Sequence, residues 1–350
     1  MAKSRKIISK KTQKKIVKTA KKNPKIFIAA VLVGILVIGV GVGAYYFLNK
    51  KDPIESGEIQ INFLELGNKY SGDSIFIQAG GKDILIDGGS RKNSAPYITN
   101  YIDSKIQDNT IEYLIVTHAH QDHIAALVGS NGQGIFDHYK VENIIQFSLT
   151  NQDETKGLYK EYLEKRDAEV ASGANLFYAN DLIENHNNVF DFGNNLSMTI
   201  LDQKFYREID KNDENNYSVC TLFTQGNNNY LFTGDLEKEG EESLVELNSL
   251  PKCELYKAGH HCSYTASNDV LLSKIRPENV VVTAVAGSDE YTKVIDNQFP
   301  AKASLERIFA YTDNVYVTSQ ILNDEVSPMN GTITFLCEDG SYMAVTYAEP

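Results

Sequence analysis

The sequence predicts an α/β protein, with an α+β order of elements, in which two β-sheets pack face to face with helices outside, behind one N-terminal transmembrane helix. Three observations lead to this class. An uncharged apolar run lies near the N-terminus, strand-like runs then precede mixed strands and helices in two similar halves, and His and Asp residues stand where several predicted strands end. Elements in such a series bury their apolar faces by stacking as layers.

Charge divides the 350-residue chain into two parts. Residues 1–51 contain 13 Lys and Arg residues and no acid, and the whole chain carries −12, so residues 52–350 carry −25. A basic tail therefore precedes an acidic body, and the pI of the whole chain describes neither part.

The apolar run covers residues 26–48, and its 23 uncharged residues suffice for a helix to cross a hydrocarbon core of ~30 Å. It is longer than the ~7–15 residues of a secretory signal core, and Tyr45, Tyr46 and Phe47 end it as interfacial aromatic residues do. Eleven cations precede the run and two follow it, so the positive-inside rule predicts a cytoplasmic N-terminus. A buried core helix is the alternative, and the unequal flanking charge argues against it.

Four segments follow from this pattern: a basic cytoplasmic tail over residues 1–25, the transmembrane helix over 26–48, a linker over 49–57 and an extracytoplasmic domain over 58–350. We expect the tail to contact anionic lipid headgroups and residues 26–48 to lie in the bilayer. The expected location is therefore the cell membrane, as a single-pass protein.

Hydrophobic periodicity predicts the elements of the domain in order. In the first half we expect strands at residues 59–64, 74–77, 84–86 and 113–117, and helices at 96–106, from about 124, and at 154–170. In the second half we expect strands at 196–201, 217–224, 230–233, 254–257 and 280–283, helices at 237–247, 269–275 and 302–311, and a closing hairpin of 332–336 with 342–347. Cys220, Cys253 and Cys337 fall in apolar strand-like runs, which favours buried free thiols.

The segment Thr117–His123 holds three of the seven His residues and one acid within six positions after a buried strand. His118 and His120 are two residues apart, so an extended loop points both side chains the same way. Asp122 and His123 stand at the start of the next helix. Imidazole and carboxylate together are ligands for zinc, manganese or iron, so the segment predicts a metal site.

Two further strand ends carry residues of the same kind. Asp235 follows the apolar strand that ends at Thr233, and His260 and His261 follow the strand that ends at Lys257. Five of the seven His residues therefore stand at strand ends, where layered folds gather their sites.

These segments occur in a recognisable order, and the chain resembles the metallo-β-lactamase superfamily over roughly residues 58–347. Within it, the chain is similar to the branch that contains the soluble domain of ComEC-type DNA-uptake proteins and bacterial surface phosphorylcholine esterases. The resemblance is carried by Gly72–Ile77, Ile84–Gly89, His118–His123, Asn216–Val219, Thr233–Asp235 and His260–Ser263.

The resemblance implies a four-layer αββα sandwich with one or two divalent transition metals at one edge, zinc first, with manganese or iron as alternatives. His118 and His120 would hold the first metal, Asp122 and His123 the second, and Asp235 would bridge them. Asp87 would support the ligands from beneath.

The resemblance leaves the adjacent His residues open: one is a ligand and the other a proton donor. We favour His260 as the ligand because it ends its strand directly, and His261 as the catalytic donor beside Asp122, which would orient the nucleophile.

Three positions depart from the pattern of the relatives. The relatives often have another His ligand between the first motif and the position of Asp235. In this chain only His138 and His186 are candidates for it. Cys262 follows the His pair where this branch usually has Gly, and packing is its favoured role over metal binding or oxidation. The relatives often carry a later Gly-His-Pro, whereas this chain reads Gln298-Phe299-Pro300.

The resulting hypothesis is a membrane-anchored, extracytoplasmic, metal-dependent hydrolase, a phosphodiesterase that acts on a phosphoester of the cell envelope. One alternative is a ComEC-like nuclease, which the charge of −25 in residues 52–350 opposes because nucleic-acid affinity rests on neutralising phosphates. The other is a degenerate domain that binds metal or ligand without turnover.

The predicted topology is tested by adding protease to intact cells. Protease should remove the domain over residues 58–350 and spare the tail over residues 1–25, because only the domain lies outside. A domain that stays protected until the cells are lysed would contradict the predicted orientation.

Overall fold

The chain forms two eight-stranded sheets within residues 57–338 and 342–347, which this computed structural model describes. The first sheet has the order β16 (Tyr342–Tyr347), β15 (Ile333–Glu338), β1 (Ile59–Phe63), β2 (Ile75–Ala79), β3 (Lys82–Ile86), β4 (Thr110–Val116), β5 (Lys140–Gln146) and β6 (Asn175–Tyr178). The second has the order β14 (Glu325–Pro328), β13 (Val315–Leu322), β12 (Asn279–Ala286), β11 (Leu255–Lys257), β10 (Asn228–Phe232), β9 (Thr221–Gln225), β8 (Leu196–Ile200) and β7 (Val189–Gly193).

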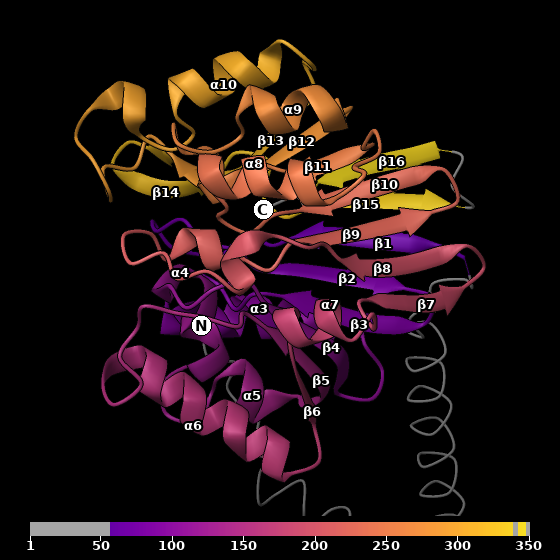
Figure 1. Cartoon of the computed structure of the whole chain (residues 1–350). Coiled ribbons are helices and arrows are strands. Elements are labelled where there is room, and N and C mark those ends of the chain that lie inside the picture. The colour runs from indigo at the N-terminus through magenta and orange to yellow at the C-terminus, as the bar shows by residue number, and fades with distance from the viewer. Residues whose placement is uncertain (1–56, 339–341, 348–350) are drawn as a thin grey trace, which may run out of the picture. The chain divides into compact units, whose positions relative to one another are not determined.

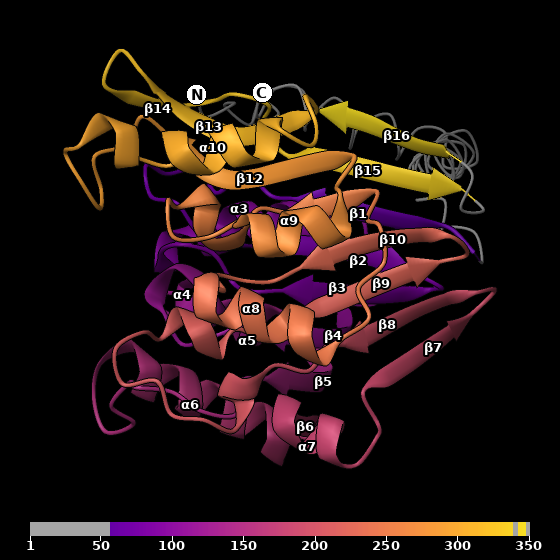
Figure 2. The same ribbon diagram turned by 45° about the horizontal axis from the view of Figure 1, so that its top comes forward.

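Helices lie on the outer sides of this pair of sheets, as Figures 1 and 2 show. With the first sheet lie α3 (Ala95–Asp103), α4 (Gln121–Val128), α5 (Ile135–His138), α6 (Gly157–Ala171) and α7 (Ala179–Glu184). With the second lie α8 (Lys238–Leu247), α9 (Asp269–Ile275) and α10 (Lys302–Phe309). The predicted arrangement of two sheets with outer helices is confirmed.

Aromatic side chains fill the space between the two sheets. Phe63 of β1 stacks on Phe232 of β10 with ring centroids 6.1 Å apart, and Phe335 of β15 meets Phe63 edge-on at 6.1 Å. Phe223 of β9 meets Phe232 edge-on at 5.8 Å. The alternating apolar residues seen in the sequence therefore face the opposite sheet, which is how each strand buries one of its sides.

Parallel pairing determines where the chemistry-bearing segments emerge. β3, β4, β5 and β6 are parallel neighbours in the first sheet, and β10, β11 and β12 are parallel neighbours in the second. The carboxyl ends of parallel strands share an edge, so the segments after Phe232 and Lys257 leave the same edge of the second sheet. The segment after Val116 leaves the first sheet at the end of β4.

A glycine lets α4 approach the turn after β3. The Gly88 N–H donates to the His123 carbonyl at 2.6 Å, and the Ala126 N–H donates to the Gly88 carbonyl at 2.8 Å. A Cβ added at Gly88 would lie 2.4 Å from Leu127 Cγ and 2.8 Å from the Leu127 backbone nitrogen. This close contact holds the first turn of α4 against the first sheet.

Some predicted bounds were wrong. The strand predicted at residues 217–224 begins at Thr221, because Asn215–Tyr217 form a 3-10 turn. The strands β5, β6, β7, β13 and β14 were not predicted, since their polar residues obscure the alternation. The helix predicted from about residue 124 begins at Gln121, which brings Asp122 and His123 into its first turn.

All four cysteines are free and buried, which agrees with the buried thiols predicted for Cys220, Cys253 and Cys337 and with the packing role favoured for Cys262. The predicted tail and transmembrane helix over residues 1–48, and most of the linker, lie outside the described residues. Among the residues that are described, no helix has both the length and the apolar character needed to span a bilayer. The membrane anchor therefore stays a prediction.

The packing between the sheets makes a stability prediction. Phe63 is fully buried, so Phe63→Ala should lower the free energy of unfolding by about 3–5 kcal/mol in equilibrium urea unfolding. Ile209 is 68% exposed, and Ile209→Ala should change it by less than about 0.5 kcal/mol. Equal effects of the two substitutions would contradict a core between the sheets.

Candidate metal centre

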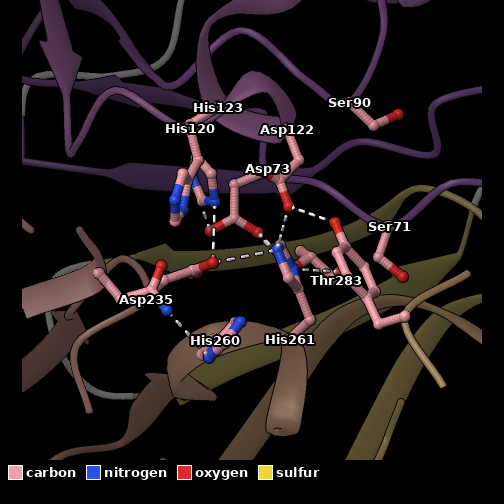
Figure 3. Close-up of polar contacts among 12 residues, drawn as sticks. Ser71, Asp73, Ser90, His120, Asp122, His123, Asp235, His260, His261 and Thr283 are labelled. Atoms are coloured by element: carbon pink, nitrogen blue, oxygen red, sulfur yellow. Dashed lines mark hydrogen bonds and ion pairs between the residues drawn. The ribbon is translucent and has the colours of Figure 1, made fainter. Parts of the chain in front are cut away.

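Four buried side chains converge between the two sheets: Asp122, His123, Asp235 and His261, each offering one ligand atom, all within 4.8 Å of one another. His123 Nε2 lies 3.0 Å from Asp235 Oδ2. His261 Nε2 lies 3.2 Å from the same oxygen and 3.4 Å from Asp122 Oδ2. Figure 3 shows the four side chains pointing toward one another from the first turn of α4, the turn after β10 and the turn after β11.

His118 and His120 lie beside this group. His118 Nε2 is 3.1 Å from His120 Nδ1, and the His118 and His123 rings have centroids 4.1 Å apart. Burial lowers the pKa of His118 well below its usual range, and the neighbouring His123 and His120 lower it further. A neutral imidazole is the form that binds metal. His118 and His120 lie next to the group of four, and neither belongs to it.

Asp87 holds His123 in position from beneath. Its Oδ2 lies 2.7 Å from His123 Nδ1, and the Thr117 N–H and hydroxyl donate to its two oxygens at 2.8 and 2.7 Å. Burial alone would lower the pKa of His123, but the Asp235 and Asp87 carboxylates outweigh it and hold that pKa well above its usual range. A carboxylate on the far ring nitrogen leaves His123 Nε2 for the centre, which is the arrangement expected of a metal-binding histidine.

A buried lysine, not predicted as part of the site, neutralises part of the centre. Lys257 is fully buried, and its Nζ lies 2.5 Å from Asp73 Oδ2 and 3.3 Å from Asp235 Oδ1, and donates to the Gly234 carbonyl at 3.0 Å. Burial would lower the pKa of Lys257, but Asp73 and Asp235 outweigh it and raise that pKa. Lys257 therefore hydrogen-bonds Oδ1 of Asp235, and Oδ2 of Asp235 faces the histidines.

Asp73 was also missed as a site residue, although it lies in the Gly72–Ile77 segment on which the resemblance rests. Its Oδ1 accepts from the Thr283 hydroxyl at 2.5 Å and lies 3.4 Å from His261 Nδ1. Burial opposes ionisation of Asp73, but Lys257 and His261 outweigh it and lower the pKa to about 2. The signal in the sequence was an acid in a turn between two apolar strands.

The two adjacent histidines point in different directions. His261 is buried with its Nδ1 2.9 Å from the Thr283 carbonyl, and its Nε2 faces the carboxylates. The side chain of His260 is 20% exposed, with its Nδ1 2.8 Å from Glu237 Oε1. Both residues have a positive φ, 45° and 51°, and this left-handed turn separates their side chains. The geometry favours His261 as the ligand, the reverse of the preference stated from the sequence.

The remaining candidates lie elsewhere. The side chain of His138, at the end of α5, is 42% exposed and bonded to Asp103, and His186 lies in the turn after α7. Cys262 belongs to a buried apolar cluster, and burial raises the pKa of its thiol to about 11.

Tyr291 donates its hydroxyl to Asp122 Oδ2 at 2.7 Å, and its ring centroid lies 5.1 Å from that of Phe299. Tyr291 thus brings a polar group close to both Asp122 and Phe299.

The donor set fits a divalent transition metal. Imidazole nitrogens and carboxylate oxygens are the ligands such metals prefer, and His118, His120, Asp122, His123, Asp235 and His261 supply both. His261 Nε2 is fully buried and has no hydrogen-bond partner in the described part of the chain, although it faces two carboxylates. A metal ion would satisfy this nitrogen and compensate the carboxylates around it.

Comparison with known proteins matches the chain to one family profile. The sequence profile described as Metallo-beta-lactamase superfamily matches residues 67–284. ComE operon protein 3 of Bacillus subtilis (strain 168) is 23% identical over 253 residues, which are 66% of this chain and 29% of that protein. Recombination protein 2 of Haemophilus influenzae is 30% identical over 111 residues, which are 31% of this chain and 13% of that protein. The chain thus spans less than a third of either relative.

Solved structures with similar folds include the metallo-beta-lactamase fold protein YhfI from Bacillus subtilis, with 11% identity and a TM-score of 0.44, covering 77% of this chain and 99% of that one. Another is CmlA, a diiron β-hydroxylase from Streptomyces venezuelae, with 12% identity and a TM-score of 0.45, covering 79% of this chain and 55% of that one.

The different directions of the two histidines make a prediction about metal content. His261→Ala should lower the number of transition-metal ions per purified chain, measured by elemental analysis, whereas His260→Ala should leave it unchanged. Asp122→Ala combined with His123→Ala should remove at least one ion and serves as the positive control. Equal loss in the two single variants, or loss only in His260→Ala, would contradict the assignment of His261 as the ligand.

Proposed function

The chain belongs to the metallo-β-lactamase superfamily, and from this membership we propose that it is a metal-dependent hydrolase that cleaves a phosphodiester of the cell envelope. The observation that carries the proposal is the buried group of Asp122, His123, Asp235 and His261, whose ligand atoms lie within 4.8 Å of one another. Imidazole nitrogens and carboxylate oxygens are the ligand types that divalent transition metals bind in proteins.

The proposed ligands are His118 and His120 for one metal, Asp122 and His123 for a second, Asp235 between them, and His261 completing the set. Zinc is the first candidate, with manganese or iron as alternatives. Such a metal, when bound, lowers the pKa of a water molecule to about 7 and polarises a phosphoryl oxygen. No sequence segment of the Gly-x-Ser-x-Gly type offers a serine nucleophile in its place.

The chain's own residues have three further tasks in this proposal. Asp122 orients the attacking water, and the contact from the Tyr291 hydroxyl at 2.7 Å supports a fixed carboxylate. His260 protonates the leaving oxygen, because it is partly exposed and its Nδ1 lies against Glu237 Oε1. Burial would raise the pKa of Asp235, but His123, His261 and Lys257 together outweigh it and hold that pKa well below its usual range. Lys257 hydrogen-bonds Asp235 Oδ1 at 3.3 Å and leaves Oδ2 facing the histidines.

The substrate class rests on location and charge. The predicted anchor over residues 26–48 and the basic tail over residues 1–25 support an enzyme tethered to the membrane with its domain outside. A phosphodiester of the envelope, in a lipid-linked or polymeric form, is within reach of such an enzyme. Within this class, the charge of −25 carried by residues 52–350 favours the lipid-linked form, because a polymeric phosphodiester, like nucleic acid, is a long polyanion.

A second candidate function is cleavage of DNA. The similarity to ComE operon protein 3 and Recombination protein 2 favours it, since the second name refers to recombination. The charge of −25 carried by residues 52–350 argues against it, because nucleic-acid affinity rests on neutralising phosphates. A domain that binds metal without turnover is the third candidate.

One experiment separates these candidates. The purified full-length chain should contain one or two transition-metal ions and hydrolyse bis(p-nitrophenyl) phosphate. The Asp122→Ala, His123→Ala double variant should lose both properties. A chain that holds metal but turns over neither this ester nor DNA would identify the non-catalytic domain, and turnover of DNA alone would identify the nuclease.

The proposed role of His260 adds a second measurement on the same enzyme. His260→Ala should keep its metal and lose ~10²–10⁴-fold in rate on an ester with a poorly leaving alcohol. It should lose much less on a nitrophenyl ester, because nitrophenolate needs little protonation to leave. A loss that does not depend on the leaving group would remove His260 from this role.

A further inference from the structure

A cavity of about 1020 Å³ lies at the carboxyl ends of β5 and β6, apart from the predicted metal ligands. Its walls come from the segment after β5, from α6, from the start of α7 and from residues near 206. Figures 1 and 2 show α6, β6 and α7 at one end of the first sheet. Ligand pockets in proteins commonly measure ~300–1,000 Å³, so the space accommodates a small molecule or part of a polymer.

The inner wall of the cavity is a network of buried polar side chains. Gln146 and Arg166 are 1% and 8% exposed. The Tyr162 hydroxyl donates to Gln146 Oε1 at 2.7 Å, and Arg166 Nη1 donates to the same oxygen at 3.3 Å. Arg166 Nη2 pairs with Asp167 at 2.6 Å. A buried network of this kind holds its members in one geometry, which is what a recognition surface requires.

Two polar side chains of this wall can bond to a ligand. Tyr159 and Gln146 both line the cavity. The Tyr159 hydroxyl and the Gln146 side-chain nitrogen are not among the buried unpartnered atoms of the described residues, so both open to the cavity. They offer hydrogen bonds to whatever occupies this space.

The charges around the cavity narrow the class of ligand. Two cations, Arg166 and Arg207, line it together with four acids, Glu154, Asp167, Asp181 and Glu184. Both arginines are paired with carboxylates, Arg166 with Asp167 and Arg207 with Asp202 at 2.7 Å. Neither arginine is therefore free to pair with a polyanionic ligand. The mixture of donors, acceptors and aromatic rings instead matches a ligand whose hydroxyls both donate and accept.

A short chain of hydrogen bonds joins the cavity to the metal centre. Thr150 lines the cavity, and its hydroxyl donates to Glu214 Oε1 at 2.6 Å. The same oxygen accepts from the backbone N–H of Ala119 at 3.4 Å. Ala119 lies between His118 and His120, so the rim of the cavity and the ligand loop share one carboxylate.

We propose that this cavity is a subsite for a neutral polyhydroxylated ligand, a sugar or polyol unit. The proposal rests on the proposed function only in assigning that unit to the same substrate as the phosphodiester. In that case the enzyme recognises the sugar or polyol at the ends of β5 and β6 while the phosphodiester lies at the metal centre.

Binding to the purified full-length chain tests the proposal without turnover. The chain is placed in phosphatidylcholine nanodiscs free of glycosidic detergent and titrated calorimetrically with N-acetylglucosamine, glucose and ribitol. Spermidine and inorganic phosphate represent the cationic and anionic classes. At least one neutral probe should bind saturably, with a Kd in the millimolar range or tighter.

Matched variants locate the binding. Tyr159→Phe removes only the hydroxyl that opens to the cavity and Glu184→Gln changes an exposed acid of the lining, and each should weaken binding about three- to tenfold. Tyr97→Phe and Glu246→Gln alter exposed residues outside the cavity and should leave binding unchanged. The Asp122→Ala, His123→Ala variant should also bind normally, so failure of the metal site is distinguishable from failure of the cavity.

Several outcomes would overturn the proposal. No saturable binding of any neutral probe, tighter binding of spermidine or phosphate, or equal affinities in cavity and control variants would each do so. Binding that is lost only in the Asp122→Ala, His123→Ala variant would assign the sugar or polyol to the metal centre instead.

Discussion

The contact of Lys257 with Asp73 and Asp235 is the interaction on which the site depends. Four carboxylates, those of Asp73, Asp87, Asp122 and Asp235, are buried at the junction of the two sheets. Burying charge without compensation is costly, and breaking a buried ion pair costs about 3–5 kcal/mol. One buried lysine compensates part of this charge, and it sits at the end of β11, beside the turn that carries Asp235. His123 and His261 lie among these carboxylates, and a divalent metal at this place would compensate the same negative charge.

The need to compensate buried charge also explains why the proposed ligands follow the ends of strands. Parallel strands deliver their carboxyl ends to one edge, and close packing of α4 at Gly88 adds the acid and histidine of its first turn. The ligands therefore stand on rigid elements from both sheets, and each is oriented by a neighbour, as His123 is by Asp87.

Much of this protein was determined by its sequence alone. Alternating apolar residues predicted the strands that build the core, because a half-buried strand must alternate. The clustering of His118, His120 and His123 predicted a metal site, because few other sites require several imidazoles close together. The sequence also predicted that Asp235 and the His260–His261 pair follow the ends of strands. Strands rich in polar residues, such as β5 and β7, were missed because their burial depends on neighbours far away in the sequence.

Only the tertiary structure determined which of these side chains face the buried centre. The left-handed backbone at His260 and His261 turns one ring into the core and the other outward, and no periodicity in the sequence encodes that turn. Asp73 and Lys257 are separated by more than 180 residues yet meet at 2.5 Å, so their roles emerge only when both sheets are assembled. Local sequence determines which side chains stand at strand ends. Long-range packing determines which of them share a buried space, because that space forms only between the two sheets.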